Sequence, residues 1–149
     1  MLKIVVDRLK EHCLAIDEKL DPVFMDINED ELKFSFPIEI HGFASITADY
    51  FVLKLNIKTF VLMPCTICNK LTKVKIIVHD FTYTEDLANV KGPSIDCSIP
   101  LREGILLELP LFAECDDMCK ERKNINHYLS KESTISQKMN FPFADLHLK

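Results

Sequence analysis

Residues 50–83 read YFVLKLNIKTFVLMPCTICNKLTKVKIIVHDFTY, and this stretch decides the fold. Apolar and polar side chains alternate at a period of two on both sides of a central C-x-x-C sequence, as in half-buried antiparallel strands. We therefore predict one strand over 50–62 and another over 71–83. The two strands would form a hairpin with Cys65 and Cys68 at its tip.

The predicted hairpin is basic in an acidic protein. The chain has a net charge of −5, which residues 1–31, an acidic N-terminal region, carry on their own. Residues 50–79 contain no Asp or Glu and hold five lysines: Lys54, Lys58, Lys70, Lys73 and Lys75. Paired antiparallel, the strands would direct these amines to one surface suited to phosphate contacts, which makes them candidate RNA-binding residues. The alternative is that exposed lysines only solvate and protect the strands. Tyr50, Phe51 and Phe60 could add base stacking, although such residues are more often part of a core.

Other segments supply the rest of an α+β fold. Period-two alternation over 32–48 predicts a further strand, with a bulge or bend at Gly42. Residues 2–8 read as a short strand. Helical spacing predicts an N-terminal helix on Leu9, Cys13, Ile16 and Leu20, and another over 99–109 that buries Ile99, Ile105, Leu106 and Leu109. Asp96 or Ser98 would cap that helix.

We expect one domain over residues 1–149. Its mainly antiparallel sheet could curl toward a barrel, with the N-terminal helix and the 99–109 helix packed against it. The Ser/Thr/Lys-rich segment 130–139 is predicted to be mobile.

The cysteines point to a metal rather than to disulfides. Residues 1–12 lack a signal-peptide core and no apolar run could span a membrane, so we expect a cytoplasmic protein with reduced thiols. Cys65-x-x-Cys68 and Cys115-x-x-x-Cys119 could complete a tetrahedral, structural zinc site. Two alternatives stay open: four ordinary thiols, or a redox C-x-x-C, which would usually sit at a helix N-terminus. Cys13 is predicted to lie in the core, and Cys97 has no evident role.

The sequence contains no catalytic constellation. Neither a G-x-G-x-x-G nor a G-x-x-x-x-G-K-[ST] pattern occurs, and the five His form no H-E-x-x-H motif. We therefore do not expect an enzyme.

Four stretches, in order, resemble the YceD family, the large ribosomal RNA subunit accumulation proteins of bacteria and plastids. They are Val61–Cys68, Ile95–Pro110 with its L-R-E-G-I-L-L-E-L-P, Cys115–Lys120, and Asn140–Leu146. Thr66-Ile67 departs from the family's C-x-R-C turn. Residues 121–126 lack the further cysteines of many relatives, so any metal must use the four cysteines already named.

The resemblance implies a non-enzymatic ribosome biogenesis factor that promotes accumulation of large-subunit (23S) rRNA by binding rRNA or a ribosomal protein. A protein-only adaptor, whose acidic N-terminal region holds a basic partner, is the alternative. The sequence suggests neither a membrane nor a small-molecule substrate as a partner.

Overall fold

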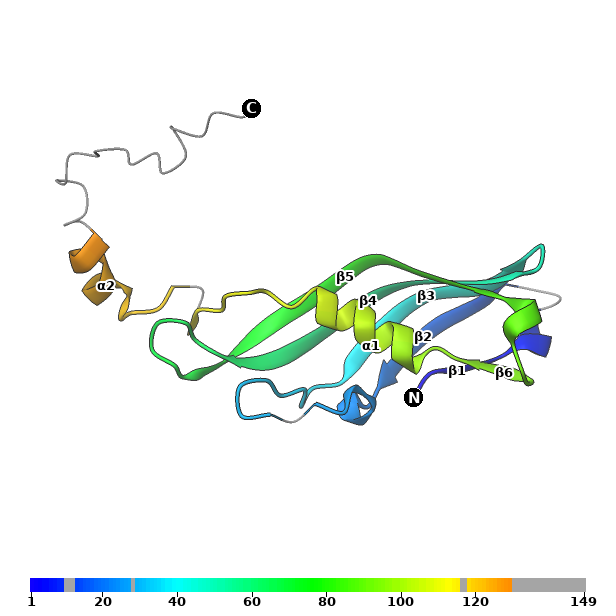
Figure 1. Ribbon diagram of the computed structural model, residues 1–149, viewed down its shortest axis with the longest axis horizontal. Helices are drawn as coiled ribbons and strands as arrows, with labels where there is room; N and C mark the ends of the chain where they lie inside the picture. Colours follow the sequence, from blue (N-terminus) through cyan, green and yellow to red (C-terminus); the bar gives the residue numbers. More distant parts are fainter. Residues whose placement is uncertain (10–12, 28, 116–117, 130–149) are drawn as a thin grey trace, which may run out of the picture.

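An antiparallel meander organises the chain in this computed structural model, which describes residues 1–9, 13–27, 29–115 and 118–129 (Figure 1). The strands are β1 (Lys3–Val5), β2 (Leu14–Leu20), β3 (Ile38–Thr47), β4 (Tyr50–Pro64), β5 (Leu71–Asp86) and β6 (Ser94–Asp96). The helices are α1 (Ser98–Leu107) and α2 (Arg122–Leu129), and short 3-10 turns cover 6–9, 22–25 and 87–89. The α+β class is confirmed.

Four strands pair in the order β2–β3–β4–β5, and β1 pairs separately with β6. The predicted hairpin is confirmed and is longer than expected, since β4 pairs with β5 from Tyr50 opposite Asp86 to Pro64 opposite Leu71. A bulge interrupts this pairing between Leu55 and Ile57. The sheet does not close into a barrel: β2 and β5 remain its outer strands.

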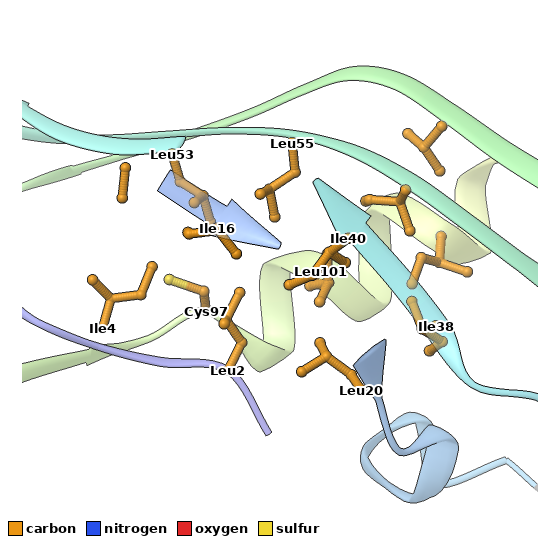
Figure 2. Close-up of a cluster of buried hydrophobic side chains, with 14 of the residues drawn as sticks. Leu2, Ile4, Ile16, Leu20, Ile38, Ile40, Leu53, Leu55, Cys97 and Leu101 are labelled. Carbon is orange, nitrogen blue, oxygen red and sulfur yellow. The ribbon is translucent and has the colours of Figure 1, made fainter. Parts of the chain in front are cut away.

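One face of the sheet carries the core, and α1 covers it (Figure 1). Alternate residues of the meander point to this face, and Leu101 of α1 packs among them with Cys97 and the start of the chain (Figure 2). The side chains at the centre are fully buried, among them Ile38, Ile40, Leu53, Leu101 and Ile105. The opposite face of the sheet carries lysines and other polar side chains together with some apolar ones, such as Phe43 and Ile77.

The predicted N-terminal helix is wrong. Leu14–Leu20 is strand β2, which pairs with β3 from Leu14 opposite Ala44 to Leu20 opposite Ile38. Ile16 and Leu20 are both buried, as predicted, but a spacing of four residues also keeps two side chains on the same side of a strand. Cys13 precedes the strand and is exposed instead of lying in the core.

Helix α1 is close to the 99–109 helix, but its buried face differs from the predicted one. Ile105 is buried as predicted and Leu106 and Leu109 are half-buried, whereas Ile99 is 70% exposed and Leu101 is buried instead. The N-cap residue is Cys97 and not Asp96 or Ser98, although Asp96 Oδ1 accepts a hydrogen bond of 2.9 Å from the N–H of Ser98, the first residue of the helix.

Gly42 is a point of close approach and not a bulge. A Cβ at this position would lie 2.0 Å from the Lys54 carbonyl oxygen, so only glycine fits there against β4. The segment 130–139, for which we predict mobility, lies outside the described residues. No helix in the described part of the chain has the length and apolar character needed to cross a membrane.

Candidate metal centre and basic sheet face

Four cysteines from two distant segments meet at the tip of the long hairpin. Cys65 and Cys68 belong to the turn between β4 and β5, and Cys115 and Cys119 belong to the segment between α1 and α2. All four Sγ atoms lie within 4.8 Å of one another, and those of Cys68 and Cys115 are 3.7 Å apart. Zn–S bonds of 2.3 Å in a tetrahedron separate sulfur atoms by about 3.8 Å, so the donor set fits zinc.

The turn is shaped by its own backbone. The Cys65 N–H donates to the Lys70 carbonyl at 2.8 Å, and the Asn69 N–H donates to the Cys65 carbonyl at 2.9 Å. Asn69 adopts a left-handed conformation with φ of 59°, which asparagine tolerates better than most residues. These contacts direct Cys65 and Cys68 toward one point.

The chain that follows α1 is tied to this turn. Figure 1 shows it returning toward the tip of the β4–β5 hairpin. The Thr66 N–H and hydroxyl both donate to the carbonyl of Ala113, at 2.8 and 3.1 Å. Ala113 precedes Cys115 by two residues, so these bonds bring the second cysteine pair to the first.

Glu114 holds the segment of Cys115 and Cys119 in place through hydrogen bonds and an ion pair. Its carboxylate accepts hydrogen bonds from the Cys119 N–H and from the Arg122 guanidinium, and it forms an ion pair with that guanidinium. The Arg122 N–H donates to the Cys119 carbonyl at 3.0 Å, which joins the loop to the start of α2.

Three of the thiols, those of Cys65, Cys115 and Cys119, have a shifted pKa. A backbone hydrogen bond from Cys68, helped by those from Ile67 and Cys115, lowers the pKa of Cys65 to about 6. A thiol hydrogen bond with Cys119, together with burial, raises the pKa of Cys115 to about 12, and burial raises the pKa of Cys119. Cys65 is thus the most acidic of these three thiols, and without a cation Cys115 and Cys119 keep their protons. Zinc ligation requires thiolates and would release those protons.

The two remaining cysteines stay apart from the cluster. Cys97 is fully buried beside α1, and burial raises its pKa to about 12. Cys13 is exposed. The C-x-x-C turn leads directly into β5, so it lacks the helix N-terminus that activates the cysteine of thioredoxin-like motifs.

The predicted lysines share the face of the sheet opposite the core. Lys54 and Lys58 alternate with buried residues of β4, and Lys73 and Lys75 are exposed on β5. In the strand register Phe60 stands opposite Lys75, and Leu62 opposite Lys73. Lys70 lies at the base of the turn, beside the cysteines. The expectation that the hairpin strands direct their lysines to one side is confirmed by this register.

These lysines differ in their partners. Lys58 Nζ lies 3.9 Å from Glu39 Oε2, and Glu39 also binds Lys19 at 2.9 Å, which lowers the pKa of this carboxyl. Lys73 Nζ lies 4.1 Å and 4.0 Å from the ring centroids of Phe36 and Phe60. Within the described ranges, the other three form no ion pair with a carboxylate: Lys54, Lys70 and Lys75.

Sequence reasoning named Phe60 as a candidate stacking residue on this face but missed Phe36. Phe51 is fully buried and cannot stack on a base, whereas Phe60 is half-buried on the lysine face. Phe36 meets Phe60 edge to face at 6.0 Å, although the alternation places Phe36 with the core residues. The β-bridge between Lys33 and Leu62 brings the segment that contains Phe36 beside β4, and no local sequence pattern predicts this contact.

Comparison with known proteins adds no relative: no family model, no curated protein and no solved structure matches the chain.

Proposed function

We propose that this protein is a non-enzymatic ribosome biogenesis factor of the YceD type, which binds large-subunit (23S) rRNA and promotes its accumulation. The observation that carries the RNA-binding part is the common direction of Lys54, Lys58, Lys73 and Lys75 on the outer face of β4 and β5. The choice of large-subunit rRNA rests on the sequence resemblance alone.

Phosphate groups are the partner that this face favours. Lys54 and Lys75 are exposed and unpaired with acids in the part of the chain that the structure describes, so their charges are available to a ligand. Two acids near this face are already engaged: Asp17 lies 2.9 Å from His41, and Glu39 of β3 binds two lysines. We therefore favour RNA over a ribosomal protein as the direct partner.

In this proposal Cys65, Cys68, Cys115 and Cys119 hold a structural zinc ion. Four thiolates leave no open coordination position, so the ion supports the fold and does not activate water. It would fix the hairpin tip, and with it Lys70, against the segment that leads to α2.

The test is binding to large-subunit rRNA fragments over a series of salt concentrations. The double variant Lys54→Glu/Lys75→Glu removes two contacts from the face. The control Lys3→Glu/Lys91→Glu makes the same change of charge at exposed lysines elsewhere. We expect the face variant to bind at least about tenfold more weakly and its salt slope to fall by roughly 1.4 to 1.8, whereas the control keeps the wild-type slope.

Equal affinities of the two variants would contradict the proposal. So would a protein that ignores rRNA and captures only a basic ribosomal protein, because the acidic surface would then be the binding surface.

A further inference from the structure

A groove of about 710 Å³ runs along β5, the edge strand of the sheet, and residues from both faces of this strand line it. Its sheet side includes Phe60, Lys73 and Lys75, and its other side is the chain that leaves α1, with Glu108, Pro110 and Phe112. A second hollow of about 600 Å³ beside the cysteines shares Lys73 with the first and adds Lys70 and Lys120. The lysines therefore line a concave track as well as a flat surface.

One aromatic residue lines each side of this groove. Phe112 is 77% exposed, so its ring is accessible to a ligand. Phe60 is half-buried and lines the opposite wall. Exposed rings in a charged groove offer flat apolar surfaces for another flat group.

The cations are placed next to these rings. Lys73 Nζ is held over Phe36 and Phe60 at 4.1 Å and 4.0 Å, so one ammonium group is fixed at the floor of the groove. Lys75, directly opposite Phe60 in the register, adds a second. Rings for bases and ammonium groups for phosphates are the combination that binds single-stranded nucleic acid.

We infer that this groove binds an unpaired stretch of RNA, with a base stacking on Phe112 and phosphates contacting Lys73 and Lys75. The inference rests on the proposed function and specifies which form of RNA is bound. A duplex is disfavoured because its bases are stacked on one another and cannot offer their faces to the Phe112 ring.

The acids of the groove set the orientation of the strand. Glu114 is already engaged by Arg122 and by the Cys119 N–H. Glu108, at the end of α1, is exposed and repels phosphates from that wall. The backbone of the RNA therefore runs along the β5 side, and the base edges point toward Glu108, whose carboxylate can accept a hydrogen bond from a base amino group.

The experiment compares a fluorescein-labelled 12-nucleotide unpaired RNA with its duplex at one salt concentration, by fluorescence anisotropy. Phe112→Ala is the test variant. Leu111→Ala is the control, because Leu111 is an adjacent apolar side chain that is 89% exposed and does not line the groove. We expect Phe112→Ala to bind the single strand about tenfold more weakly, with Leu111→Ala unchanged. A 2-aminopurine base in the RNA should lose its stacking-induced quenching in Phe112→Ala only.

Two results would overturn the inference. If Phe112→Ala and Leu111→Ala bind alike and the duplex binds as well as the single strand, the groove does not stack bases; Lys54→Glu/Lys75→Glu would still weaken binding, so the proposed function would survive. If no RNA binds and an extended peptide occupies the groove, both the inference and the proposed function are wrong. Equal thermal unfolding of the two alanine variants, expected for exposed side chains, excludes misfolding as the cause.

Discussion

Removing the proposed zinc ion should destabilise the protein, and the size of the effect can be calculated from the loop that the zinc site closes. The perturbations are extraction with a chelator and the substitution Cys115→Ser, which removes a half-buried ligand without opening a large cavity. Both break the link between the hairpin tip and the segment that precedes α2. We expect each to lower the free energy of unfolding of the zinc-loaded protein.

The expected loss of stability follows from the length of the loop that the zinc site closes. Cys68 and Cys115 are 47 positions apart. The chain-entropy relation for a single cross-link of that span gives about 4 kcal/mol at 25 °C. For a chain of this size, 4 kcal/mol corresponds to a fall in Tm of about 8–16 °C.

The assay is metal analysis of protein purified without chelator, followed by thermal unfolding monitored by circular dichroism. We expect one zinc ion per chain in the wild type and in the control Cys13→Ser, whose thiol is exposed and outside the cluster. Cys115→Ser should bind zinc weakly and melt near the temperature of the chelated wild type.

Two outcomes would refute this reasoning. One is wild-type protein that contains no zinc and cannot be loaded with it. The other is a Cys115→Ser variant that matches Cys13→Ser in both metal content and Tm, which would leave the cluster as four ordinary thiols.

Three further predictions concern residues of the fold outside the four-cysteine cluster. Gly42→Ala should lower the free energy of unfolding in urea by about 3 kcal/mol, because its Cβ would overlap the Lys54 carbonyl; an unchanged midpoint would contradict the close strand approach. Hydrogen bonds from the first residue of α1 lower the pKa of Asp96, so its carboxylate contributes stability above its unfolded pKa and loses it as the pH falls through the lower folded value. Urea titrations should show a greater loss for the wild type than for Asp96→Asn between about pH 5 and pH 2. Burial raises the pKa of Cys97 to about 12, so mass spectrometry after iodoacetamide treatment at about pH 8 should find Cys13 alkylated and Cys97 intact.

The hairpin could be predicted from the sequence because both of its strands are long and alternate over most of their length. The same regularity placed the lysines on one face, and the paired spacing of Cys65–Cys68 and Cys115–Cys119 identified the four residues that the structure brings together. Each of these signals is local, or repeats over enough residues to exclude other periods.

The errors arose where the pattern was short or the partner distant. Ile16 and Leu20 fit a helix and a strand equally well, and only pairing with β3 decides between them. Phe112 looks like an ordinary apolar residue in a linker, and its place in the groove depends on the Thr66–Ala113 hydrogen bonds, which link positions 47 apart. No period within one segment can report such contacts.

The separate pairing of β1 with β6 has a consequence for the order of folding. Strands β3, β4 and β5 need only short loops to meet, whereas Leu2 and Ser98, which are joined by a hydrogen bond of 3.0 Å, are 96 positions apart. Closure entropy rises with loop length, and the β1–β6 ladder has only three residue pairs, to which Leu2 and Ile4 add core contacts. We therefore expect the first strand in the chain to dock last, and its amide protons to be among the earliest to exchange with deuterium in the native protein.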